Sequence, residues 1–175
     1  MEMTNDLLEK AIIFATKKHK GQKRKGNGLP YIVHPLGVMS IFLEVKESKN
    51  ITMLLIAILL HDVKEDANVS LKKIAKEFGH QVAALVEELT LDKDKYETVG
   101  KTELLCQEVI KMSSYALVIK LADRLYNIRD TKSMPVEFRD KYFEETRVII
   151  KTLETGRKLT KSQKKLVQMI KTVIK

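Results

Sequence analysis

The most apolar run of this chain, from Ile51 to Leu60, constrains its fold more than any other feature of the sequence. The run is about half the length that a helix needs to cross a membrane, so it predicts a buried core helix and no membrane partner. The polar dipeptide His61-Asp62 follows directly. Because a charged carboxylate at the end of a core helix is costly to bury, Asp62 must meet a partner, a metal ion or solvent.

Apolar residues recur at helical spacing along most of the chain, and turn-forming residues are few. The 175 residues include seven Gly and three Pro, whereas Leu, Ile, Lys and Glu are abundant, a mixture that favours helices. We therefore predict an all-α fold, a compact helical bundle in which residues 1–175 form a single domain. Helices are expected at 4–20, 36–45, 51–63, 71–78, 82–89, 101–112, 116–131, 135–153 and 160–175, with loops at 21–30 and 91–100.

Charge and cysteine content narrow the classes of partner and location. With 32 basic and 23 acidic residues the chain carries a formal net charge of +9, which favours an anionic partner. Nucleic acid, an anionic membrane and a small phosphorylated molecule all satisfy that charge. The lone Cys106 excludes an internal disulfide, and the acidic start of the chain does not look like a signal peptide. We therefore expect a cytoplasmic protein.

The turn after the apolar run concentrates ionisable groups. Glu65 lies four residues after His61, and Asp66 lies four residues after Asp62, so each pair is expected to share a helical face. Three carboxylates so close together repel one another unless cations or protons compensate. The alternative is a helix end that has reached solvent.

Two further segments offer donor atoms of the same kinds. His34 precedes Pro35, at the mouth of a predicted helix, where it could also be a capping residue. Asp123 and Asn127 are spaced to share one face of a helix beside apolar positions, where Asp123 could also pair with Lys120 or Arg124. Two imidazoles and two carboxylates would form a mixed nitrogen and oxygen site suited to manganese, iron or zinc.

An ion in such a site, if it accepts five or six ligands, keeps an open position for water. Binding lowers the pKa of that water, and the same ion polarises a phosphoryl oxygen. Glu65 and Asp66 would then form the acid/base pair that orients or deprotonates the water. The residues alone therefore indicate a plausible metal-dependent hydrolytic centre.

The order His34, His61-Asp62, Asp123 resembles that of the HD metal-dependent phosphohydrolase superfamily. More narrowly, four strings look like the alarmone (ppGpp) hydrolase domain of the RelA/SpoT homologue family. They span 19–25, 30–35, 59–66 and 120–129, and the segment 78–90 also matches. The likeness runs from about residue 5 to 155, and the chain is most similar to the stand-alone small alarmone hydrolases. We predict that residues 156–175, beyond this likeness, form a basic C-terminal helix that packs on the domain.

This resemblance implies manganese-dependent hydrolysis of guanosine 3′,5′-bis(diphosphate), ppGpp, or of pppGpp, with release of pyrophosphate from the 3′ position. The products would be GDP or GTP, and the reaction, of the phosphoric diester hydrolase class, would lower the stringent-response alarmone. The resemblance also implies roles for particular side chains. They are His34, His61, Asp62 and Asp123 as ligands of one metal ion, Glu65 and Asp66 in water activation, and Arg24, Lys25 and Asn127 in nucleotide binding.

The chain departs from the family pattern at Lys64, where an uncharged residue is usual, and it matches only partly over 91–95. Lys64 either faces outward or meets substrate phosphate. His19 matches a family position, but its spacing from the other histidines suggests a structural hydrogen bond. His80 is expected at the surface. Neither is predicted to be a ligand.

Three other interpretations stay open. The same metal site could serve an HD phosphohydrolase acting on NADPH, as a 2′-phosphatase, or on deoxynucleotides. A basic nucleic-acid-binding module is a second interpretation, with 157–175 as its best candidate segment, although nucleic acid is disfavoured because aromatic residues rarely interleave with the lysines. A catalytically inactive regulatory domain is the third interpretation, disfavoured because all the residues that match the family's metal ligands and acid/base pair are present. An oligomer is compatible with the sequence.

Overall fold

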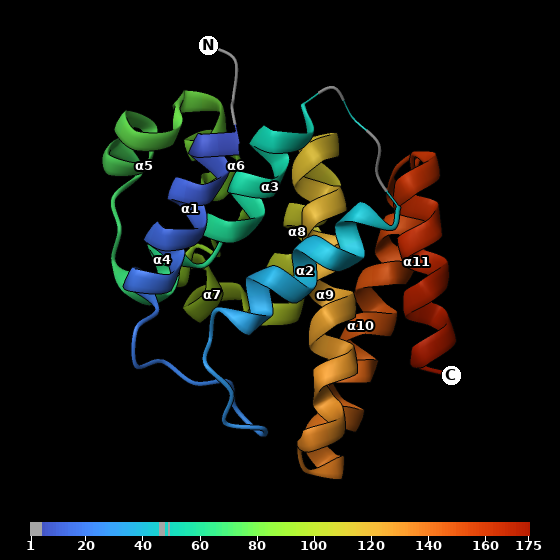
Figure 1. Cartoon of the computed structure of the whole chain (residues 1–175). Helices are drawn as coiled ribbons and strands as arrows, with labels where there is room; N and C mark the ends of the chain where they lie inside the picture. Colours follow the sequence, from blue (N-terminus) through green and yellow to red (C-terminus); the bar gives the residue numbers. More distant parts are fainter. Residues whose placement is uncertain (1–4, 46–47, 49) are drawn as a thin grey trace. The chain divides into compact units, whose positions relative to one another are not determined.

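The computed structural model describes residues 5–45, 48 and 50–175, which form eleven α-helices and one short 3₁₀ helix, without a β-strand in those ranges (Figure 1). The all-α prediction is therefore confirmed. The chain divides into two compact units, of which the first ends at Thr90 and the second begins at Leu91. That residues 1–175 form a single domain stays a prediction. In the described part, no helix combines the length and the apolar character needed to span a membrane.

Unit 1 is built around the predicted core helix α3, Ile51–Leu60, which contacts α1, α2 and α6. Its residues from Met53 to Leu60 are all buried, as expected for an apolar run with no polar face. The other helices of unit 1 are α1 (Asn5–Lys18), α2 (Val33–Leu43), α4 (Val63–Ala67), α5 (Leu71–Phe78) and α6 (His80–Leu89).

Several predicted boundaries of unit 1 hold. The Ser70 hydroxyl accepts a hydrogen bond from the Lys73 amide and caps α5, and Gly79 ends that helix at a φ of 94°. The helix expected from Leu36 begins earlier, at Val33, so His34 lies in the first turn of α2. Pro35 is tolerated at the third helical position because the first amide groups of a helix have no intrahelical acceptor.

The prediction of one helix over 51–63 is wrong. Helix α3 ends at Leu60, a turn follows at His61 and Asp62, and the separate short helix α4 begins at Val63. His61 and Glu65 therefore do not share the face of one continuous helix. Asp62 instead stands directly before α4, where its carbonyl accepts a hydrogen bond from the Asp66 amide at 2.8 Å. His61 and Asp62 therefore lie in the turn between α3 and α4, and neither is part of the helix α3.

Unit 2 contains α7 (Lys93–Val99), α8 (Lys101–Lys111), α9 (Ser114–Asp130), the 3₁₀ helix η1 (Thr131–Ser133), α10 (Val136–Gly156) and α11 (Lys161–Val173). Helix α9 contacts α10 and α11, and α8 contacts α7 and α10. The prediction of a loop over 91–100 is wrong, because Lys93–Val99 form helix α7. The Asp92 carboxylate accepts a hydrogen bond from the Lys95 amide and caps this helix. Most of α7 is exposed, so its sequence lacks the apolar stripe that would have indicated a helix.

A buried guanidinium fixes α9 on α10. Arg124 donates a hydrogen bond to the Glu145 carboxylate at 2.6 Å and lies 4.6 Å from the centre of the Tyr142 ring. Removal of either partner would leave the other charge buried and uncompensated, so the pair holds α9 against α10 at this position. Asp123 is the residue before Arg124 on the same helix.

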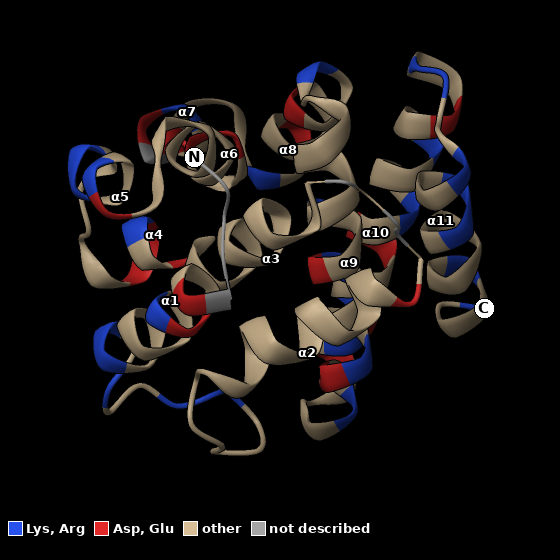
Figure 2. Cartoon of the chain, turned by 45° about the horizontal axis from the view of Figure 1, so that its top comes forward, with Lys and Arg blue, Asp and Glu red and all other residues tan. Residues whose placement is uncertain are grey.

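The predicted C-terminal helix packs within unit 2. Leu166 and Ile170 of α11 are fully buried, and Thr160 and Gln163 form a capping box at its start. The helix contacts α9, and its basic residues lie along the outside (Figure 2). The apolar stripe is thus used for internal packing and is not available to insert into a membrane.

Candidate metal centre

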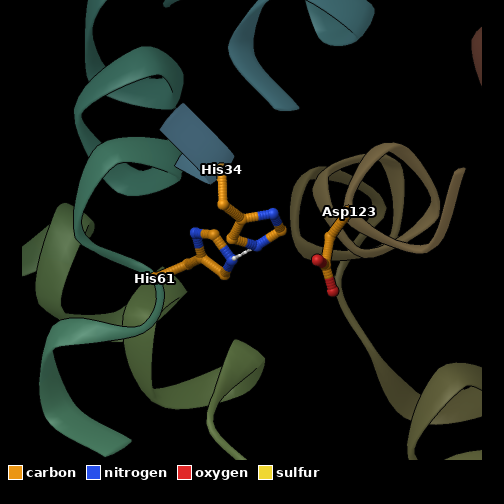
Figure 3. Close-up of side chains that lie close together, drawn as sticks. All are labelled: His34, His61 and Asp123. Carbon is orange, nitrogen blue, oxygen red and sulfur yellow. Dashed lines mark hydrogen bonds between the residues drawn. The ribbon is translucent and has the colours of Figure 1, made fainter. Parts of the chain in front are cut away.

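Unit 1 brings His34, His61 and Asp62 together. The Nε2 atoms of the two imidazoles lie 3.3 Å apart, and both rings are buried (Figure 3). Asp62 Oδ2 lies 3.0 Å from Nε2 of His61 and 3.4 Å from Nε2 of His34. Three donor atoms predicted from the sequence to bind one ion therefore converge on one point.

These spacings fit a divalent metal ion. Ligand atoms placed at 2.0–2.2 Å from an ion and at right angles to one another are about 3 Å apart. The observed 3.0–3.4 Å therefore requires shifts of only a few tenths of an ångström. In addition, Nδ1 of His61 lies 2.6 Å from the carbonyl oxygen of Ile58, to which it donates a hydrogen bond. That bond leaves Nε2 of His61 as the nitrogen available to a metal.

The protonation state of Asp62 also suits a ligand. Burial alone would raise the pKa of its carboxyl, but the charge of His61 and hydrogen bonds from His34 and His61 outweigh burial. Together they hold the pKa of Asp62 well below its usual range. Asp62 is therefore ionised, which is the form that binds cations.

Tyr31 supports this carboxylate and was not singled out from the sequence. Its hydroxyl donates a hydrogen bond to Asp62 Oδ2 at 2.7 Å, and its ring stacks on His19 at 4.7 Å between centroids. Burial and the negative charge of Asp62 raise the pKa of Tyr31 far above its ordinary value, so the hydroxyl remains a donor. The only sequence signal for this role was the position of Tyr31 three residues before His34.

The Tyr31→Phe variant is expected to bind Mn²⁺ about 10- to 100-fold more weakly, the usual cost of losing a hydrogen bond to a metal ligand. Isothermal titration calorimetry on the purified protein measures this change. The matched control is Tyr96→Phe, because Tyr96 lies in α7 and is 42% exposed. Equal affinities for Tyr31→Phe and the wild type would show that the hydroxyl does not support the site.

Unit 2 supplies the second predicted group of residues. Asn127 donates a hydrogen bond to Asp123 Oδ1 at 2.6 Å, which confirms that the two share one face of α9. Nζ of Lys120 lies 3.8 Å from Asp123 Oδ2, so one of the two foreseen ion pairs is present, whereas Arg124 pairs with Glu145. The Asp123 side chain projects from α9 (Figure 3) and is 13% exposed.

The remaining predicted site residues lie in two segments of unit 1. Glu65 and Asp66 are in α4, which follows the His61-Asp62 turn directly, and half-buried Lys64 precedes them. Arg24 and Lys25 lie in the basic loop, residues 19–31, where the guanidinium of Arg24 is 5.4 Å from the centre of the Tyr31 ring.

The two remaining histidines take the places expected of them. The predicted structural hydrogen bond of His19 is confirmed, since its Nδ1 lies 2.7 Å from the side-chain oxygen of Gln22. His80 is exposed at the start of α6, also as predicted.

Comparison with known proteins identifies the family. Residues 11–158 match the HD domain. The chain is 39% identical over 170 residues to the human guanosine-3′,5′-bis(diphosphate) 3′-pyrophosphohydrolase MESH1, covering 91% of this chain and 92% of that protein. It is 40% identical over 142 residues to a GTP pyrophosphokinase of Streptomyces antibioticus, of which the match covers only 16%. A solved structure described as a metazoan orthologue of SpoT that hydrolyses ppGpp has a TM-score of 0.81, at 31% identity over 97% of this chain and 96% of that one.

The chain therefore belongs to the HD domain family. Within that family it spans nearly the full length of the small relatives of the MESH1 type, but only a small part of the longer pyrophosphokinases.

Proposed function

We propose that this protein is a metal-dependent hydrolase of guanosine 3′,5′-bis(diphosphate), as its MESH1 relatives are named. The observation that carries the proposal is the cluster of His34, His61 and Asp62 donor atoms in a chain that covers 92% of human MESH1. Water attacks the phosphorus attached to the 3′ oxygen, the bond between these two atoms breaks, and a proton reaches the departing 3′ oxygen. The products are pyrophosphate and GDP, or GTP when pppGpp is the substrate.

The proposed metal ligands are His34, His61 and Asp62 of unit 1 with Asp123 of unit 2. The imidazoles of His34 and His61 and the carboxylate of Asp123 are ligand groups that a metal ion accepts. Asp123 is also the last residue in the order His34, His61-Asp62, Asp123 that resembles the family. A mixed nitrogen and oxygen ligand set suits manganese, the ion that we propose. Such an ion, when bound, would lower the pKa of a water molecule and polarise a phosphoryl oxygen.

The other proposed roles follow from charge and position. Glu65 and Asp66, one turn beyond the ligands, would orient the attacking water and take its proton. Arg24 and Lys25 supply cations for a substrate with four or five phosphates, and the planar guanidinium can bind phosphate and stack on a base. Asn127, held against Asp123, would contact the ribose and its phosphate. The proposed partner is thus a small nucleotide, and the proposed location of the protein is the cytoplasm.

A nucleotide panel tests this function. The Mn²⁺-loaded protein is expected to release pyrophosphate from ppGpp and to leave NADPH and deoxynucleoside monophosphates intact. Chelation of the metal with EDTA should abolish the release, and added Mn²⁺ should restore it. Turnover of NADPH or of a deoxynucleotide without turnover of ppGpp would overturn the proposal in favour of another HD phosphohydrolase.

A further inference from the structure

One side chain joins the basic loop to the helix that carries the proposed acid/base pair. The side-chain nitrogen Nε2 of Gln22 donates a hydrogen bond to the backbone carbonyl of Asp66 at 2.9 Å, and its Oε1 lies 2.7 Å from Nδ1 of His19. The backbone of Gln22 adds two more bonds, to the His19 carbonyl and from the Tyr31 amide, both at 3.0 Å. Gln22 thus connects the end of α1, the loop and α4.

The chemistry of the two acceptors fixes the orientation of this amide. A backbone carbonyl can only accept, so the NH₂ group of Gln22 must face Asp66 and the oxygen must face His19. Nδ1 of His19 is therefore the protonated donor nitrogen. The His19 ring is itself buried and stacked on Tyr31, whose hydroxyl donates to Asp62. Asn carries the same two groups on a side chain that is one methylene shorter, so Gln suits the distance between these two partners.

The carbonyl of Asp66 needs such a partner. Helix α4 has five residues, and the carbonyl groups in the last turn of a helix have no intrahelical donor. The chain then leaves α4 through Asn68, which has a φ of 52°. A side chain 44 positions earlier in the sequence therefore ties down the end of a very short helix.

We infer that Gln22 is a positioning residue that holds Glu65 and Asp66 in register with the loop carrying Arg24 and Lys25. This inference rests on the proposed function. The loop is also closed by bonds of its own, including a hydrogen bond from the Arg24 amide to the Leu29 carbonyl at 2.8 Å. Loss of the Gln22 side chain should therefore preserve the bond that closes the loop itself, and shift the loop with Arg24 and Lys25 relative to Glu65 and Asp66.

Two substitutions separate the two bonds of the side chain. Gln22→Met preserves the volume and removes both bonds, whereas Gln22→Glu keeps an acceptor for His19 and places a carboxylate oxygen against the Asp66 carbonyl. We expect kcat for ppGpp to fall at least about tenfold in both variants, with KM within about threefold of the wild type. The control is Gln107→Met, because Gln107 is exposed in α8 and its side chain donates a hydrogen bond to Glu103 of the same helix.

Hydrogen exchange followed by mass spectrometry provides a readout independent of activity. In Gln22→Met, amides in 19–31 and 62–69 should exchange faster together, while those in 71–89 remain as in the wild type. A merely structural role would lower the melting temperature and the metal-binding stoichiometry, but not kcat per metal-loaded site.

Wild-type kcat in either Gln22 variant, or unchanged exchange over 62–69 in Gln22→Met, would overturn the inference. Absence of ppGpp turnover in the wild type would instead overturn the proposed function. Failure of the inference is thus seen in the Gln22 variants, by kcat or hydrogen exchange, whereas failure of the proposed function is seen in the wild type, by the absence of ppGpp turnover.

Discussion

Replacement of His61 by alanine is expected to abolish Mn²⁺ binding and ppGpp hydrolysis together, with kcat/KM falling at least about 1,000-fold. The substitution removes the Nε2 atom that lies 3.0 Å from Asp62 Oδ2 and 3.3 Å from Nε2 of His34. It also removes a group in direct contact with the Asp62 carboxylate, so the proposed site loses one ligand and the neighbour of a second.

Calorimetry with Mn²⁺ and a thermal unfolding scan with and without the ion separate metal loss from misfolding. In the wild type, Mn²⁺ at 100 times its Kd should stabilise the fold by about 2.7 kcal/mol, whereas His61→Ala should gain nothing. His80→Ala is the matched control, because His80 is exposed. Asp123→Asn, which preserves side-chain volume, provides a second test. Wild-type Mn²⁺ affinity in His61→Ala would contradict the assignment.

The sequence was sufficient for the core and for the residue types of the site. The run from Ile51 to Leu60 has no polar face, so it could only be a buried helix, and it is one. The spacing of Asp123 and Asn127 placed them on one helical face, and their hydrogen bond shows that they are. Both predictions depend on local periodicity, which a sequence displays directly.

What the sequence did not reveal depends on contacts between distant segments or on a single backbone turn. No Gly or Pro marks the end of α3, so the break after Leu60 could not be read from residue types. The bonds from Tyr31 to Asp62 and from Gln22 to Asp66 span 31 and 44 positions and have no periodic signature. Helix α7 was missed because a cap at Asp92, rather than an apolar stripe, defines it.

The break after Leu60 changes the interpretation of the proposed acid/base pair, Glu65 and Asp66. Asp62 stands at the start of α4 and Glu65 and Asp66 lie within it, so the proposed ligand and the proposed pair belong to one short element. The spacing between this proposed ligand and the proposed water-activating groups is then set by the five residues of α4 and by the contacts at the end of that helix. This arrangement makes the carboxylates separable from the metal site by mutation.

Conversion of the proposed acid/base pair to amides is expected to lower kcat for ppGpp by about 10²- to 10⁴-fold while Mn²⁺ affinity stays near that of the wild type. The variants are Glu65→Gln and Asp66→Asn, each of which preserves shape and removes the capacity to take a proton. Steady-state kinetics with calorimetry on the same samples measures both quantities. Loss of catalysis with metal retained distinguishes these residues from His61, whose replacement should remove both.

The double variant decides whether the two carboxylates act as a unit. If they orient and deprotonate one water together, Glu65→Gln with Asp66→Asn should lose little more activity than the worse single variant, because groups that act on one step are not additive. Glu87→Gln is the control, since Glu87 is exposed in α6. A product of the two single losses would instead mean independent roles. A kcat within threefold of the wild type in both single variants would remove Glu65 and Asp66 from the chemistry and leave water activation to the metal ion alone.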